Sequence, residues 1–131
     1  GVVTVPASAT VAEAATLLSE MRIGTVVVSE DGETADGILS ERDIVRELAT
    51  SGSGCLSQAV SEYMTRELVT CTSQANVESV LTQMTEGRFR HMPVVEDGKL
   101  IGIVTLGDAV KAQLSKLAME KDALEGMIMG H

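Results

Sequence analysis

The chain of 131 residues has no tryptophan, one tyrosine and one phenylalanine, so aromatic side chains make up only 2% of it. This scarcity excludes a core built on aromatic rings. Apolar residues nevertheless reach 44%, and we expect the core to consist of valine, leucine, isoleucine, alanine and methionine. A chain of this length forms one compact domain or two small halves that share a core.

Positive charge is also scarce, because 10 Lys and Arg residues stand against 19 Asp and Glu residues and give a formal net charge of −9. This balance would repel a phosphate backbone over most of the surface, so we expect no nucleic-acid partner. The acidic residues are dispersed along the chain rather than grouped, which argues against an acidic interaction tail.

Long apolar runs and a cysteine framework are missing as well. The apolar runs are only a few residues long, whereas a membrane-spanning helix needs about 20, so we expect no membrane association. No charged start followed by an apolar stretch indicates a signal peptide. The two cysteines, Cys55 and Cys71, lack framework spacing. We interpret them as reduced thiols, which predicts a cytoplasmic protein.

The sequence does contain an internal repeat. Residues 3–32 align with residues 69–98, and both segments end in Glu-Asp-Gly. The first copy then has one additional residue in a turn, so that Asp43 aligns with Asp108. Insertions are tolerated best in turns, which supports this alignment. The chain therefore contains two copies of one unit.

Each copy is predicted to fold as strand, helix, strand, strand, helix. Apolar residues at helical spacing follow Thr10 and Asn76, which are good helix N-caps. Apolar runs joined by an Asp-Gly turn predict one hairpin in each copy. The predicted strands are residues 2–5, 24–29, 36–40, 68–71, 92–96 and 100–105. The other predicted helices are residues 42–50, a short helix at 56–65 that leads into the second copy, and residues 108–125.

These elements define an α/β (α+β) fold of two βαββα repeats. Neither repeat could bury an adequate core alone, so we expect the two to pack against each other with pseudo-twofold symmetry. The predicted division is residues 2–50 (first repeat), 51–65 (linker and leading helix of the second repeat), 66–117 (second repeat) and 118–131 (C-terminal helix extension). The last helix has an apolar stripe, which predicts packing on a partner subunit in a homodimer. The stripe consists of Val110, Leu114, Leu117 and Leu124.

The same short motif ends the last strand of each copy. A glycine and two apolar residues precede a hydroxyl residue, Ser40 or Thr105, and an aspartate follows three positions later. One interpretation is that each hydroxyl residue and its aspartate only cap the following helix. The alternative is a ligand site, because helix N–H groups and a hydroxyl suit a phosphate, and an aspartate beside them suits a ribose diol.

At these residues the repeats resemble cystathionine β-synthase (CBS) domains, and the tandem resembles a Bateman module of the small standalone bacterial type. The resemblance covers about residues 2–117 and rests on "VSEYMT" (60–65), "HMPVVEDGKLIGIVT" (91–105) and the two hydroxyl-x-x-Asp strand ends. It implies binding of a small adenosyl ligand. AMP, ADP, ATP and NAD(H) are the first candidates, and S-adenosylmethionine is a less favoured one.

The resemblance also implies two clefts, each of which joins the helix start of one repeat to the early strands of the other. Carried over to this sequence, the first cleft comprises Ser40, Arg42, Asp43, Thr70, Arg90, His91, Met92 and Pro93. The second cleft comprises Thr4, Gly24, Thr25, Val26, Thr105 and Asp108.

Charge distinguishes these two clefts. The first gathers Arg42, Arg90 and His91, whereas the second has Gly107 in place of Arg42 and Thr25 in place of His91. Because arginine binds phosphate oxygens through charge-assisted hydrogen bonds, we predict that the first cleft binds phosphorylated adenosine more tightly. The second is expected to be weak, empty or suited to a less charged part of a ligand.

Catalysis is not expected. It needs a nucleophile with its base, an acid–base pair or a metal, and the chain has one interior histidine without a second His or thiol at metal-ligand spacing. By internal symmetry Asp43 and Asp108 serve separate clefts. We therefore predict no catalytic residue, catalytic cofactor or metal.

Two functions remain open at this point. The first is a regulatory module that senses energy or redox state by binding an adenine nucleotide, and that transmits occupancy to a regulated protein or to its own dimer. The second is a structural dimerisation or assembly module with vestigial clefts. Nucleotide binding that depends on Asp43 and Arg42 would distinguish the first from the second.

Overall fold

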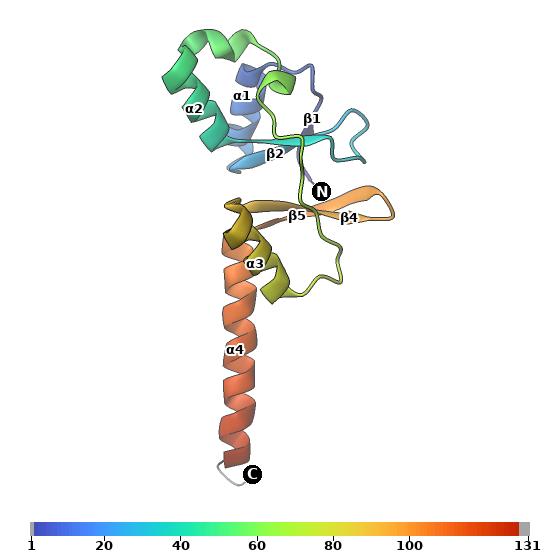
Figure 1. Cartoon of the computed structure of the whole chain (residues 1–131), viewed down its shortest axis with the longest axis vertical. Coiled ribbons are helices and arrows are strands. Elements are labelled where there is room, and N and C mark those ends of the chain that lie inside the picture. The colour runs from blue at the N-terminus through green and yellow to red at the C-terminus, as the bar shows by residue number, and fades with distance from the viewer. Residues whose placement is uncertain (1, 129–131) are drawn as a thin grey trace.

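Two small sheets face one another at the centre of the molecule, with helices on the outer side of each (Figure 1). The computed structural model describes the backbone of residues 2–128 and the side chains of residues 2–119. The strands are β1 (Thr4–Val5), β2 (Thr25–Val28), β3 (Gly37–Ser40), β4 (His91–Glu96) and β5 (Lys99–Thr105). The helices are α1 (Val11–Met21), α2 (Glu41–Ser51), α3 (Val77–Gly87) and α4 (Leu106–Ile128), with 3-10 turns η1 (Ser53–Ser57) and η2 (Val60–Glu62). This mixed architecture confirms the predicted fold class.

The first repeat buries the larger core. Thr10 caps α1 by accepting a hydrogen bond from the N–H of Glu13 (3.1 Å), and α1 ends at Arg22 in the left-handed conformation. Strand β2 follows, pairs in parallel with β1 and antiparallel with β3, and is buried over its whole length. The buried face of α1 packs on these strands through Val11, Ala14 and Leu18.

The second repeat reproduces the backbone hydrogen bonds of the first. The N–H of Glu41 donates to the carbonyl of Gly24 (2.9 Å), and at the equivalent positions the N–H of Leu106 donates to the carbonyl of Arg90 (2.8 Å). Helix α3 also ends in a left-handed arginine, Arg88, as α1 ends in Arg22. The same backbone geometry therefore recurs in both halves, as the repeat alignment predicted.

The first strand of the second repeat is shorter than predicted. Of residues 68–71, only Cys71 makes a ladder contact, a parallel bridge to Val94. Val69 is 43% exposed, so this segment lies at the surface and lacks the burial that would hold it as a strand. The second sheet therefore contains only β4 and β5.

The predicted short helix at 56–65 is wrong. The segment forms the 3-10 turns η1 and η2, and part of its backbone pairs with the first repeat. The N–H of Val60 donates to the carbonyl of Ala9, and the N–H of Thr65 donates to the carbonyl of Ile38. The N–O distance is 2.8 Å in both hydrogen bonds. Val60 and Met64 join the core of the first repeat, so the segment packs on that repeat. The boundaries 2–50, 51–65, 66–117 and 118–131 stay predictions.

Helix α4 extends well beyond the second sheet (Figure 1). It begins two residues before the predicted start, and the hydroxyl of Thr105 accepts from the N–H of Asp108 (3.0 Å). Val110, Leu114 and Leu117 of the predicted stripe are 42%, 62% and 50% exposed. Leu124 lies outside the described side chains. The homodimer through this stripe stays a prediction.

Among the described residues, no helix combines the length and apolar character that crossing a membrane requires.

Candidate ligand-binding clefts

A hollow of about 350 Å³ lies between the start of α2 and the loop that joins α3 to β4. We call it the basic hollow, because four arginines line it: Arg42, Arg46, Arg88 and Arg90, named here the arginine cluster. Ser40, Asp43 and His91 line it too. In a chain of net charge −9, four guanidinium groups on one concave surface favour an anion such as a phosphate.

A smaller apolar space of about 280 Å³, the side hollow, adjoins the basic hollow. The two share Ile38, Thr65, Phe89 and His91. Leu68, Val69 and Pro93 complete its apolar wall. A flat apolar group attached to a phosphorylated group can therefore be accommodated beside the arginine cluster.

The Ser40–Asp43 corner does cap α2. The Asp43 carboxylate accepts from both the N–H and the hydroxyl of Ser40 (2.9 Å each), while the hydroxyl of Ser40 accepts from the N–H of Asp43 (3.2 Å). These bonds to Ser40 use Oδ2 alone, and Oδ1 lies 3.7 Å from a nitrogen of Arg46. Capping and lining of the basic hollow thus coexist, since the cap uses only one carboxylate oxygen and the other faces Arg46.

His91 begins β4 and is half-buried at the edge of the basic hollow. Burial lowers the pKa of its imidazole, and Glu41 opposes this effect. A methyl group placed on Gly24 would lie 3.8 Å from Nε2 of His91 and 3.7 Å from Oε1 of Glu41. The lowered pKa keeps the ring largely uncharged at neutral pH, able both to donate and to accept a hydrogen bond.

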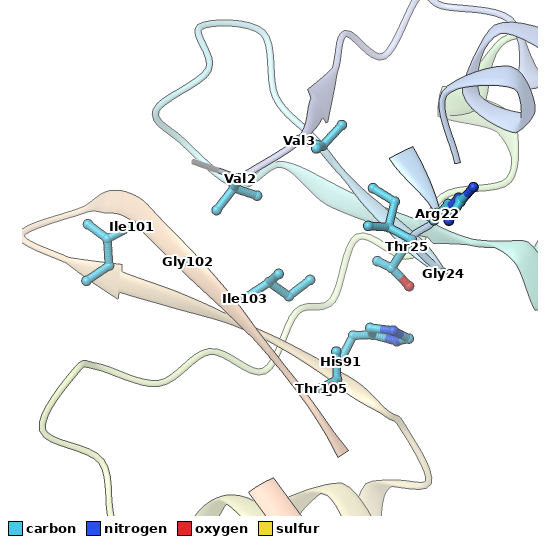
Figure 2. A pocket seen from close by; sticks show the side chains of 11 residues that line it. Val2, Val3, Arg22, Gly24, Thr25, His91, Ile101, Gly102, Ile103 and Thr105 are labelled. Atoms are coloured by element: carbon cyan, nitrogen blue, oxygen red, sulfur yellow. The ribbon is translucent and has the colours of Figure 1, made fainter. Parts of the chain in front are cut away.

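A second hollow of about 580 Å³ lies on the other side of His91, between the two sheets (Figure 2). We call it the apolar hollow, because its walls are mainly Val2, Val3, Ile23, Ile101 and Ile103. Its polar groups are few, and the remaining lining residues are Arg22, Gly24, Thr25, His91, Gly102 and Thr105. It resembles the basic hollow in position but lacks the arginine cluster.

Thr25 is the unusual polar group of the apolar hollow. The residue is only 7% exposed, and its hydroxyl oxygen has no hydrogen-bond partner among the residues that the structure describes. A buried hydroxyl without a partner is destabilising, and most such groups in folded proteins are paired. The hydroxyl therefore needs an explanation beyond packing.

Most of the predicted first-cleft residues meet at the basic and side hollows. Ser40, Arg42, Asp43, Arg90, His91 and Pro93 line one or both of them. Met92 does not, because strand alternation turns it into the second core, and it is fully buried. Thr70 is exposed and lies on neither wall.

Only half of the predicted second-cleft residues line the apolar hollow. Gly24, Thr25 and Thr105 do so. Val26 faces the first core by strand alternation, and Thr4 is not on the wall. Asp108 is exposed in the first turn of α4, where it is engaged with Thr105 as a cap. That Thr4, Val26 and Asp108 contact a ligand stays a prediction.

Several lining residues were missed by the sequence prediction, and three charged ones among them matter most. Arg22 lines the apolar hollow, and its alignment with Arg88 was the available signal. Glu41 and Arg46 line the basic hollow from α2. Arg46 lies one helical turn after Arg42, so helical spacing could have indicated it; nothing in the sequence singled out Glu41.

Neither cysteine adds a reactive group to these hollows. Cys55 is buried, and burial raises the pKa of the Cys71 thiol, which keeps it protonated. In the part of the chain that the structure describes, no three His, Cys, Asp or Glu side chains are grouped closely enough to hold a metal ion.

Two copies of one strand–helix–hairpin–helix unit, with ligand-sized hollows between their sheets, define a tandem-repeat binding module. The family model for the CBS domain matches residues 1–50 and 60–115. The chain therefore belongs to the CBS domain family, as the sequence resemblance implied.

Solved structures agree with this assignment. The CBS-domain protein ATU1752 from Agrobacterium tumefaciens is 44% identical, with a TM-score of 0.82 over 86% of this chain and 90% of that one. PAE2072 from Pyrobaculum aerophilum, complexed with AMP, is 27% identical, with a TM-score of 0.76 over 88% and 92%. The CBS pair of MJ0100, complexed with 5′-methylthioadenosine and S-adenosyl-L-methionine, is 27% identical, with a TM-score of 0.78 over 88% and 90%.

The chain spans 61%, 66% and 65% of the length of the first three curated relatives it matches.

Proposed function

We propose that this chain is a regulatory module that binds an adenine nucleotide in the basic hollow and transmits occupancy to a regulated protein or to its own dimer. The observation that supports this most strongly is the arginine cluster, which gathers four cations beside His91 in an otherwise acidic chain. Adenosyl ligands in the related MJ0100 and PAE2072 structures support the ligand class.

The lining suggests where each part of the nucleotide binds. The apolar wall of the side hollow suits the adenine ring. The Oδ1 oxygen of Asp43, which takes no part in the helix cap, suits the ribose diol, and the arginine cluster suits the phosphates. AMP, ADP, ATP and NAD(H) share these parts, whereas S-adenosylmethionine has a cationic sulfonium and no phosphate, so the arginines favour the nucleotides over it.

Catalysis is not part of this proposal. The groups around the basic hollow are cations, a helix cap and a largely uncharged imidazole, which bind and orient a phosphorylated ligand. No described side chain supplies a nucleophile hydrogen-bonded to His91.

The exposed stripe on α4 favours a second function, assembly. Leu114 and Leu117 are at least half exposed, which is unusual unless a partner covers them. We treat assembly as compatible with binding, because the stripe and the basic hollow lie on different elements. An assembly-only module would leave nucleotide binding absent.

A titration panel distinguishes the two functions. Thermal shifts and calorimetry with AMP, ADP, ATP, NAD, NADH and S-adenosylmethionine are measured on the wild type, Asp43→Ala and Asp108→Ala. A ligand at about 100 times its Kd adds roughly 2.7 kcal/mol of stability. Both variants lose an equivalent helix cap, but only Asp43 lines a hollow.

We expect at least one nucleotide to bind the wild type and Asp108→Ala similarly, and to bind Asp43→Ala about tenfold more weakly. No shift with any ligand would leave assembly as the better account. Equal weakening in both variants would assign the effect to capping and remove Asp43 from the site.

A further inference from the structure

The turn of the first hairpin is one residue longer than the turn of the second, and the structure shows what the longer turn contacts. Residues 29–36, which we call the bridging turn, reach β5 of the other repeat. The backbone carbonyl of Glu33 accepts a hydrogen bond from the N–H of Leu100 (2.5 Å). This hydrogen bond joins the two repeats, because Glu33 belongs to the first and Leu100 to the second.

We propose that the bridging turn is a latch that holds the two sheets together at their hairpin ends, and that Asp31 is the positioning residue that keeps the latch closed. Both hairpins point to the same side of the molecule, away from α2 and α4 (Figure 1). The latch therefore ties the sheets at the end opposite to the helices. This inference goes beyond the proposed function and does not depend on it, because no ligand takes part in the latch.

A single carboxylate organises the bridging turn. Oδ1 of Asp31 accepts hydrogen bonds from the backbone N–H groups of Glu33 and Thr34 (2.8 Å each), and Oδ2 accepts from the hydroxyl of Thr34 (3.2 Å). The backbone hydrogen bonds from Thr34 and Glu33 lower the pKa of Asp31 to about 2. The carboxylate is therefore charged at neutral pH, and hydrogen bonds to a charged acceptor are stronger than neutral ones.

The geometry of the peptide bond explains how Asp31 directs the Glu33 carbonyl. This carbonyl and the N–H of Thr34 belong to one planar trans peptide unit, in which the two groups point in opposite directions. Because the N–H points inward to Asp31, the carbonyl points outward, where it meets Leu100. The position of the carboxylate thus determines whether the hydrogen bond between the repeats forms.

Ser29 anchors the bridging turn to the first sheet. The residue is buried, and its N–H donates to the carbonyl of Val5 in β1 (2.9 Å). Its hydroxyl donates to Oδ1 of Asp31 (3.1 Å) and accepts from the N–H of Gly32 (2.9 Å). The carboxylate that directs the latch is therefore fixed to the sheet that the latch belongs to.

The second hairpin lacks this arrangement, although it contains the equivalent aspartate. Val95 stands where the first repeat has Ser29. The turn consists of Asp97 and Gly98 alone, both with positive φ, and β4 and β5 pair up to the residues on either side of it. The latch is therefore specific to the first repeat, and Asp97 provides a matched control for Asp31.

The latch supports β5 at its least regular point. The register of β4 and β5 shifts next to Leu100, and Ile101 is the residue left without a partner there. A bulge of this kind disrupts the ladder locally. Ile101 also lines the apolar hollow together with Val2 and Val3 of the first repeat. Closing the latch therefore holds one wall of that hollow in place and joins the movement of the two sheets.

Amide hydrogen exchange, measured by NMR on the full chain, tests the latch directly. The variants are Asp31→Ala, Asp31→Asn and Ser29→Ala, and Asp97→Ala is the matched control. The amide of Leu100 reports on the latch. The amide of Val95, which is hydrogen-bonded within the second repeat, reports on the second sheet as a whole.

We expect Asp31→Ala to speed exchange at Leu100 about tenfold or more and to change exchange at Val95 less than about twofold, because only the latch opens. Ser29→Ala should have a smaller effect in the same direction. Asp31→Asn should stay close to the wild type, because an amide oxygen also accepts two hydrogen bonds. Asp97→Ala should change neither amide.

Four results would overturn the proposal. The first two are a Leu100 amide that is unprotected in the wild type, and unchanged exchange at Leu100 in Asp31→Ala. The others are equal acceleration at Leu100 by Asp31→Ala and Asp97→Ala, and equal acceleration at Leu100 and Val95, which would reflect general loss of the second sheet. If Asp31→Ala does not fold, Ser29→Ala against Asp97→Ala decides the question by the same criteria.

Discussion

The basic and apolar hollows are built on the same backbone corner yet offer opposite chemistry. Equivalent hydrogen bonds hold both corners, from Glu41 to Gly24 and from Leu106 to Arg90. The side chains then differ: Arg90 and His91 in one hollow correspond to Gly24 and Thr25 in the other. Backbone geometry alone therefore does not determine what a cleft binds, and a few substitutions at paired positions separate an anion site from an apolar one.

The two cores differ as well. The first repeat gathers a long list of buried residues, including those of the 56–65 segment, whereas the buried core of the second is Val80, Met84, Met92 and Ala109. A cavity of about 150 Å³ remains beside Cys71, where the first repeat has the buried Val5. The first repeat therefore buries more apolar side chains behind the shared clefts than the second does.

Removing arginines from the basic hollow should abolish the difference in phosphate binding between the basic and apolar hollows. Arg42→Ala combined with Arg90→Ala deletes two cations of the arginine cluster, and each charge-assisted hydrogen bond is worth about 1.5–3 kcal/mol. We expect AMP binding to weaken about 100-fold or more by calorimetry. Lys99→Ala with Lys111→Ala is the control, since it changes net charge equally away from the hollow. Similar losses in both pairs would show that overall charge, not the cluster, governs binding.

Transplanting the basic pair should create a second phosphate site. Gly24→Arg with Thr25→His gives the apolar hollow the pair that the basic hollow has at Arg90 and His91. The Cβ of the new arginine fits without a clash, because a methyl group at Gly24 would lie at ordinary contact distance from its neighbours. We expect inorganic phosphate to bind one additional equivalent per chain, measured by calorimetry. Unchanged stoichiometry in a folded variant would mean that other residues set the difference.

The imidazole of His91 should make phosphate binding depend on pH. Burial lowers its pKa below the ordinary value of 6.5, so the free protein holds the ring largely neutral above that pH, whereas a bound phosphate favours the charged form. Binding therefore takes up a proton, and affinity for AMP should rise a few-fold as pH falls from 7.5 to about 6. We expect His91→Asn to flatten this rise in affinity. A histidine placed elsewhere, at the N-cap of α3 by Asn76→His, should not restore it. An equal slope in His91→Asn would assign the dependence to the ligand's own phosphate.

The same shift has a consequence for the stability of the free protein. Because the folded-state pKa of His91 is depressed, the unfolded chain binds the proton more readily in the window below 6.5. The neutral histidine therefore costs the folded state nothing above that window. As pH falls through the window, the free energy of unfolding decreases, because the unfolded chain takes up the proton first. In denaturant titrations the wild type should lose more stability than His91→Asn between pH 7 and 5.5; identical losses would contradict the assignment.

The smallest expected effect is a gain in stability. Thr25→Val removes a buried hydroxyl that has no partner among the described residues and extends the valine run of β2. We expect about 1 kcal/mol of stabilisation in urea titrations. Destabilisation would indicate that the hydroxyl is satisfied within the folded chain.

The sequence predicted the parts of this account that depend on local pattern. The N-caps at Thr10 and Asn76 and the two hairpins follow from periodicity and turn residues, and they are observed. The predicted helix at 56–65 failed because its backbone pairs with Ala9 and Ile38, a contact between distant segments that local spacing does not encode. Gly37 is explained only by this contact, since a side chain there would meet Met64 and Thr65 at 2.9 Å.

The site was predictable to the extent that the repeat determines it. The repeated motif indicated Ser40 and Asp43, and the family resemblance implied His91; all three line the basic hollow. The prediction did not take into account that successive side chains of a strand point to opposite faces. This alternation directs Val26 and Met92 into the two cores. The role of Glu41 depends on how the two sheets approach each other across Gly24, which no feature of either repeat alone reveals.

The central claim is that the basic hollow recognises the phosphate of an adenine nucleotide. The most direct test is a pair of calorimetric titrations of the wild-type chain, one with AMP and one with adenosine, in the same buffer. We expect AMP to bind at least about tenfold more tightly than adenosine, because only AMP has the phosphate that the arginine cluster suits. Equal affinity for adenosine and AMP would contradict it.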